Sequence, residues 1–99
     1  NVIKLGSIAF KQAYRLVVRG YFDTLDTLGL YVFGSYDGRE WAFVGGNEKK
    51  GNFTDIGCVI SHADMKYFRV CLAGKVGKDS RIDFIEISAD GSVLNTKLR

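Results

Sequence analysis

One histidine and a few scattered acids are the residues with which this chain could do catalytic chemistry. His62 has Ser61 beside it and Asp64 two positions later, which are the residue types of a nucleophilic triad. A triad also needs a strained turn that exposes the nucleophile, and no such motif surrounds Ser61. Metal binding needs more histidine or grouped carboxylates, and Asp23 and Asp26 alone are too few. We therefore expect no enzyme, no metal site and no cofactor.

Residues suited to binding lie at expected strand ends and in expected loops. Three of them are aromatic residues whose position does not force the ring inward, and five are polar or charged. The predicted ligand or partner contacts are Tyr21, Tyr36, Arg39, Asn47, Lys49, Lys50, Asn52 and Phe53. Residues 46–55, GNEKKGNFTD, are the predicted mobile loop among them. Loops on a rigid scaffold commonly carry binding residues, so this cluster is the candidate site.

A β-hairpin over residues 29–45 is the element best placed to position these residues. Its two apolar runs, residues 30–33 and 41–44, flank a polar segment that contains Asp37-Gly38. An Asp-Gly pair between β-type runs favours a tight turn, because glycine accepts a positive φ without steric cost.

Strand-like runs separated by turn signals fill the rest of the chain. The expected strands span residues 2–8, 12–22, 30–33, 41–44, 56–60, 66–73, 81–89 and 92–98. Residues 23–28 and 74–80 are polar or glycine-rich and predict loops. About eight short strands with minimal helix, and turn signals about every ten residues, predict an all-β antiparallel sandwich or barrel.

Details of the pattern predict a β-bulge and an aromatic core. Apolar alternation begins at Ile82 and Phe84 and then shifts phase at Ile85 and Ile87, which one extra residue in the strand would explain. Aromatic side chains within strands are expected to pack inward. The predicted core aromatics are Tyr31, Phe33, Trp41, Phe68 and Phe84.

Composition limits the class of protein. Ninety-nine residues, 46% of them hydrophobic, predict one domain over residues 1–99. Neither a long apolar run nor a basic leader is present, so we expect no membrane insertion, and the strand-like ends suggest a domain cut from a longer chain. A net charge of +3, scattered along the chain, argues against nucleic-acid binding. Cys58 and Cys71 could pair across adjacent strands or remain free thiols.

The order of five motifs resembles the discoidin or coagulation-factor type C domain, a galactose-binding-like jelly roll. These motifs occupy residues 3–6, 14–20, 30–41, 67–70 and 81–87. The most specific of them is the Ser-x-Asp-Gly-x-x-Trp hairpin at residues 35–41. The resemblance implies an antiparallel jelly-roll sandwich in which Trp41 packs the two sheets together. The N-terminal portion that supplies several ligand-binding loops in that family has no counterpart here.

These observations predict a non-catalytic interaction or assembly module of a larger extracellular, cell-surface or virion structural protein. Its partners would be other domains or subunits of the assembly. The alternative is a carbohydrate-binding module that uses the loop aromatics Tyr21, Tyr36 and Phe53 to contact glycans.

Overall fold

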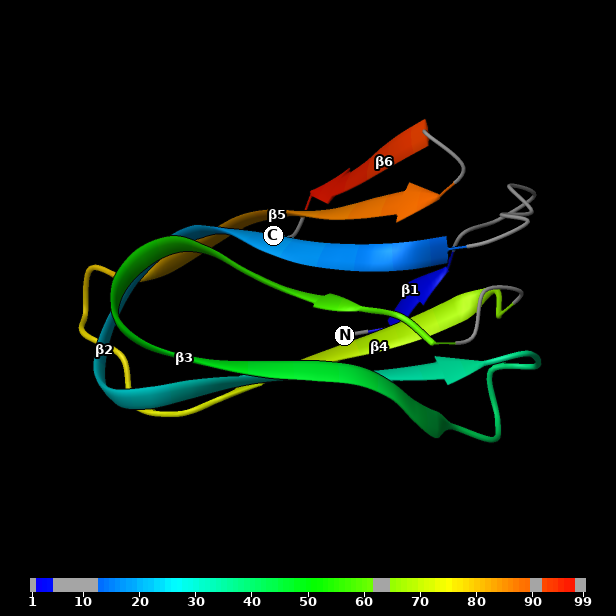
Figure 1. Ribbon diagram of the computed structural model, residues 1–99, viewed down its shortest axis with the longest axis horizontal. Coiled ribbons are helices and arrows are strands. Elements are labelled where there is room, and N and C mark those ends of the chain that lie inside the picture. Colours follow the sequence, from blue (N-terminus) through cyan, green and yellow to red (C-terminus); the bar gives the residue numbers. More distant parts are fainter. Residues whose placement is uncertain (1, 5–12, 62–64, 90–91, 98–99) are drawn as a thin grey trace.

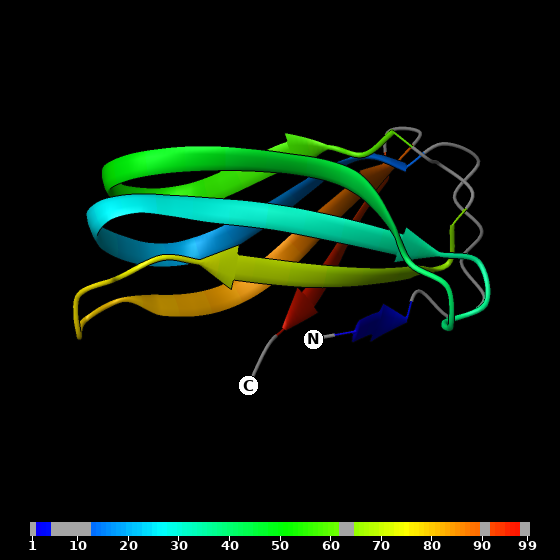
Figure 2. The ribbon, with the colours of Figure 1, turned by 90° about the horizontal axis from the view of Figure 1, so that it is seen from below.

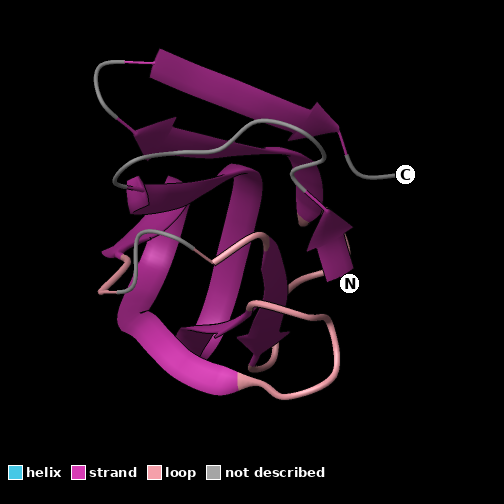
Figure 3. Ribbon diagram, turned by 90° about the vertical axis from the view of Figure 1, so that its right-hand side faces the viewer, coloured by secondary structure: helices cyan, strands magenta, loops and turns pink. Residues whose placement is uncertain are grey.

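The computed structural model describes residues 2–4, 13–61, 65–89 and 92–97 of the chain. In these segments the protein is all-β, and the strands are antiparallel, as the sequence predicts (Figure 3). No helix long and apolar enough to cross a membrane occurs in them. The strands, which form one sheet, are β1 (Val2–Lys4), β2 (Ala13–Ser35), β3 (Ala42–Val59), β4 (Tyr67–Ala73), β5 (Arg81–Ala89) and β6 (Ser92–Lys97).

The long strand β2 organises this sheet. It pairs with β3 along most of its length, with β5 through residues 13–21, and with β4 through residues 29–35. β2 and β3 bend together midway, so that the two halves of the sheet face each other (Figure 1). The first layer contains the start of β2, the end of β3, β5 and β6. The second layer contains the end of β2, the start of β3, β4 and β1.

The bend depends on hydrogen bonds between Thr24 and Gly51. The Thr24 hydroxyl donates to the Gly51 carbonyl and accepts from the Gly51 N–H, both at 2.7 Å. The β2–β3 register is interrupted between Asp23 and Thr27, and Gly51 has a φ of +93°, a conformation that favours glycine. The buried Thr24 hydroxyl therefore replaces ladder hydrogen bonds where the two strands turn the corner.

Two predicted loops are parts of these long strands, so the loop prediction is wrong there. Residues 23–28 belong to β2, and residues 46–55 belong to β3. Among the described strands β3 pairs only with β2, and an edge strand with one side toward solvent tolerates polar residues and glycines. The described chain therefore has six strands, two of them long, in place of about eight short ones. The loop predicted at 74–80 contains only an isolated bridge, between Thr24 and Val76.

The predicted hairpin is confirmed, but residues 36–41 connect β2 to β3 in place of a tight turn. Gly38 has a φ of +79°, and Gly34 at the end of β2 pairs with Ala42 at the start of β3. The Asp37 carboxylate accepts backbone hydrogen bonds from Arg39 and Glu40. These bonds, together with the hydroxyl of Ser35, hold the pKa of Asp37 below its usual value.

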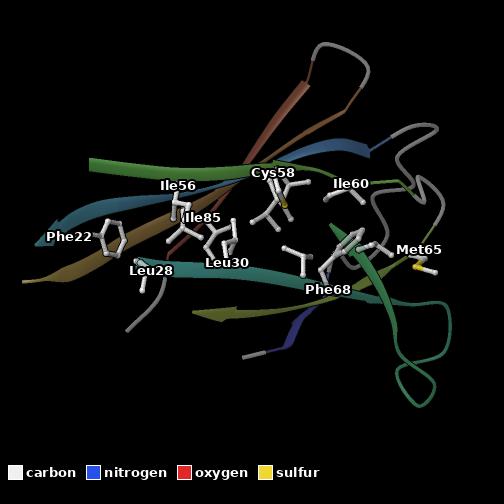
Figure 4. Close-up of a cluster of buried hydrophobic side chains, with 14 residues drawn as sticks. Phe22, Leu28, Leu30, Ile56, Cys58, Ile60, Met65, Phe68 and Ile85 are labelled. Atoms are coloured by element: carbon white, nitrogen blue, oxygen red, sulfur yellow. The ribbon is translucent and has the colours of Figure 1, made fainter. Parts of the chain in front are cut away.

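The core lies between the two layers and is mainly aliphatic (Figure 4). Strand alternation explains its membership: Leu16 and Val18 are fully buried, whereas Arg15 and Arg19 point outward from the same strand. The largest fully buried side chains are Phe68, Leu16, Leu30, Ile56, Ile85, Ile87, Val18 and Val32.

The predicted β-bulge in β5 is confirmed. Arg19 pairs with Phe84, but the next residue, Gly20, pairs with Ile82, which leaves Asp83 as the extra residue. A side chain at Gly20 would collide with the Arg81 carbonyl, so the close approach of the strands requires glycine. Ile85 and Ile87 are buried, whereas Ile82 is 39% exposed and Phe84 is half-buried, so the first two apolar residues of the strand do not join the core.

Most of the predicted aromatic core is wrong. Phe68 is fully buried, but Tyr31, Phe33, Trp41 and Phe84 are only half-buried and lie outside the core cluster. Leu30 and Val32 occupy the inward positions of β2, so the alternating residues Tyr31 and Phe33 must face outward. Mainly aliphatic side chains fill the space between the layers, whereas Tyr31, Phe33 and Trp41 lie on the outer side of the second layer.

The two cysteines are free thiols. Cys58 is buried in the core, and burial raises its pKa to about 11. Cys71 alternates with Val70 and Leu72, which pack on the core, and therefore points the other way. The cysteines sit on different sides of the sheet, so this fold does not join them.

Candidate functional site

The outer side of the second layer carries a group of rings that we call the aromatic face. It consists of Tyr31, Phe33, Trp41, Phe43 and Arg69, which come from β2, β4, and the start of β3 with the residue before it. Figure 2 looks onto this layer and shows β2 between β3 and β4. Phe33 pairs with Phe43 on one side and with Arg69 on the other, so these three residues form a row across the strands.

Phe43 is the most exposed ring of the aromatic face. It is 57% exposed, and it meets Phe33 edge to face, with ring centroids 5.8 Å apart and planes at 72°. Aromatic pairs prefer this arrangement. Gly46 lies beneath the Phe43 ring, and a side chain there would crowd it. The ring is thus held by its neighbours while more than half of it remains open to solvent.

Trp41 and Arg69 form a cation–π pair. The guanidinium carbon of Arg69 lies 4.4 Å from the centroid of the Trp41 ring. Trp41 lies on the β3 side and Arg69 lies on β4, with β2 between them, so the two side chains meet over β2. Arg69 makes no ion pair with any other described residue. Its charge is therefore oriented by a ring and left available to an external anion.

Tyr31 and Glu48 mark the opposite end of the aromatic face. The Tyr31 hydroxyl lies 3.5 Å from a carboxylate oxygen of Glu48. The Tyr31 ring lies over Gly29, where any side chain would displace it. Gly29 also pairs with Glu48 in the β2–β3 ladder, so one negative charge stands beside the ring.

The outer side of the first layer is different, and we call it the charged face. It presents Arg15, Arg19, Asp55 and Glu86. Arg19 lies 3.0 Å from Glu86 and 3.6 Å from Asp55. A hydrogen bond from Lys49 lowers the pKa of Asp55 most, and the charges of Lys49, Arg19 and Arg15 lower it further. Most charges on this face are satisfied within the protein.

Side-chain hydrogen bonds connect the two halves of β3. We call this set of contacts, made by Asn47, Lys49 and Ser61, the β3 seam. The Asn47 amide donates to the Gly57 carbonyl at 2.9 Å. Lys49 donates to the carbonyl and the carboxylate of Asp55, each at 2.9 Å. Ser61, just after β3, donates through its N–H and hydroxyl to the Val44 carbonyl. These bonds close one side of the folded sheet.

The eight predicted contact residues do not lie together in the structure. Asn47 and Lys49 bond within the β3 seam, and Phe53 packs on Phe22 of the core with ring centroids 5.3 Å apart and Lys49 above it. Tyr36 and Arg39 are exposed in the hairpin turn.

The other three predicted residues lie far from that turn. Lys50 and Asn52 are exposed on either side of Gly51 at the bend, at the opposite end of the molecule (Figure 1). Tyr21 is half-buried in β2 opposite Arg81. No single loop-borne site results.

The residues that sequence reasoning missed are Phe33, Phe43 and Arg69. The sequence carried this information for Phe33. If Leu30 and Val32 face inward, strand alternation places Phe33 on the outer side. His62 and Asp64 of the considered triad lie outside the described residues. Among the residues that are described, no group of three or more His, Cys, Asp or Glu side chains could hold a metal.

Comparisons with protein-family models, with curated proteins and with solved structures find no match for this chain. The functional proposal therefore depends on the chemistry of the two faces.

Proposed function

We propose that this chain is a non-catalytic interaction module that binds another protein surface through its aromatic face. The observation that carries the proposal is the exposed Phe43 ring beside the Trp41–Arg69 pair on the outer side of the second layer. Contiguous apolar surface of this kind marks interaction sites more often than does a single exposed apolar residue. Tyrosine, tryptophan and arginine are also the residue types that dominate the binding energy of protein interfaces.

A glycan is a weaker fit to the same surface. Sugar rings stack on open aromatic faces, but the Arg69 guanidinium already lies over the Trp41 ring. The predicted loop aromatics do not converge either, since Phe53 packs on Phe22 while Tyr36 is exposed in the hairpin turn. Protein contact is therefore the function that the geometry favours.

The wider assignment is also a proposal: a discoidin-like jelly-roll module of an extracellular or virion assembly. It is supported by the order of the five sequence motifs. The outward position of Trp41 counts against it, because the resemblance implies a core tryptophan. The interaction proposal does not depend on this family.

Photo-crosslinking tests the interaction module. A photoreactive phenylalanine analogue replaces Phe43, and in a control protein it replaces Arg15, which is exposed on the charged face. We expect covalent protein adducts from position 43 in cells that produce the protein, and few from position 15. Equal yields from both positions, or none from position 43, would contradict the proposal.

A further inference from the structure

We infer that the occupant of the aromatic face is a second copy of this chain, bound in a twofold symmetric dimer. The inference rests on the proposed function and names its partner. Its basis is the placement of two opposite charges, Arg69 and Glu48, on the two flanks of the face.

The strand register fixes the positions of these charges. Arg69 is level with Phe33 on the β4 side of β2, and Glu48 is level with Gly29 on the β3 side. They are therefore separated by roughly 13 Å along the strands and about 10 Å across them, given the usual rise per residue and strand spacing. Tyr31 lies midway between the two levels.

This arrangement is self-complementary. A twofold axis that lies in the plane of the interface, passes over Tyr31 and runs perpendicular to the line from Arg69 to Glu48 exchanges the two charges. A second copy related by that axis places its Glu48 over Arg69 and its Arg69 over Glu48. A symmetric interface of this kind forms both ion pairs with the same surface patch on each subunit.

The same axis also accommodates the rings. Phe43 lies near it, so the exposed Phe43 rings of the two copies meet and lose solvent contact. An acidic peptide would satisfy Arg69 but would leave Glu48 facing like charge, whereas a second copy satisfies both. Because the aromatic face consists of only five residues, the interface is small, and the dimer should be weak and strongly concentration-dependent.

Sedimentation equilibrium of the purified chain with charge-reversal variants tests the inference. Wild-type protein should approach twice the monomer mass of 11.0 kDa as its concentration rises. Arg69→Glu and Glu48→Arg should each weaken self-association at least about tenfold, because each creates two like-charge contacts per dimer. An equimolar mixture of the two variants should regain association, since in the mixed dimer both contacts join opposite charges.

Two controls distinguish a loss of the interface from a loss of the fold. Arg15→Glu, on the charged face, should leave self-association unchanged, and circular dichroism confirms folding of each variant. Glu48→Arg keeps the Trp41–Arg69 pair, so its effect does not depend on loss of that contact.

A wild-type chain that stays monomeric, or a mixture that fails to regain association, would overturn the second-copy inference. If position 43 then still crosslinks to a different protein, the interaction module stands with another partner. If it crosslinks to nothing, the proposed function fails as well.

Discussion

The aromatic face and the charged face are the two outer sides of one folded sheet, and both are built from the outward positions of β2. In the first half of β2 those positions hold Arg15, Val17 and Arg19, and in the second half they hold Tyr31 and Phe33. On the charged face, Arg19 finds Asp55 and Glu86 within the molecule. On the aromatic face, the cation rests on a ring and finds no anion among the described residues. Most charges of one face are thus paired within the protein, whereas the cation of the other face has no anionic partner among the described residues.

The largest expected effect on stability comes from removing the hydrogen bonds that hold the bend between the two faces. Thr24→Val keeps the shape of the side chain but leaves the Gly51 N–H and carbonyl without their partner. We expect a loss of about 1–3 kcal/mol in the free energy of unfolding, measured by urea denaturation. Thr24→Ser, which retains the hydroxyl, should lose clearly less. Equal losses in the two variants would show that the hydroxyl does not hold the bend.

A smaller effect, on the quenching of tryptophan fluorescence, should appear in variants of the aromatic face and not in variants of the charged face. Trp41 is the only tryptophan, so its emission reports on this face alone. Arg69→Gln removes the guanidinium from the ring, at a cost of about 0.5–1 kcal/mol, and should make Trp41 more accessible to acrylamide quenching. Arg15→Gln should leave quenching unchanged. The same quenching in wild type and Arg69→Gln would mean that the cation does not cover the ring in solution.

The smallest effect should concern the charged face and the way in which stability falls at acidic pH. Because its folded-state pKa is lowered, the Asp55 carboxylate contributes stability above its unfolded pKa near 3.9, and this contribution is lost as the pH falls through the folded pKa. The side chain is 45% exposed, so the contribution is at most about 0.5 kcal/mol. Asp55→Asn should therefore reduce stability at pH 7 and flatten its decline below pH 4, as followed by thermal denaturation. An identical decline in wild type and variant would assign the acid sensitivity to other carboxylates.

Local chemistry made part of this fold predictable. Asp37-Gly38 identified the hairpin, because the connection between its strands needs the positive φ that Gly38 adopts. The change of apolar phase between Phe84 and Ile85 predicted a bulge in this strand, and the register is irregular just before Phe84, at Asp83.

The bend and the faces were harder to predict, because they depend on long-range pairing. Residues 46–55 have the composition of a loop, but β2 holds them in a strand through its ladder hydrogen bonds. Trp41 was expected inside as an aromatic residue of a strand, yet it lies just before β3, is half-buried and packs against the exposed Arg69. The candidate site moved from the predicted loops to the aromatic face for the same reason. Burial of a ring depends on long-range strand pairing, which the local sequence does not show.

The β3 seam has a further consequence for how the protein behaves at high concentration. An exposed sheet edge is a template on which strands of other molecules can add, and this leads to aggregation. Folding β3 back on itself occupies Val44, Gly57 and Asp55 carbonyls that would otherwise be open to a foreign strand. A chain with so much β-structure therefore protects its longest edge with its own Asn47, Lys49 and Ser61 side chains.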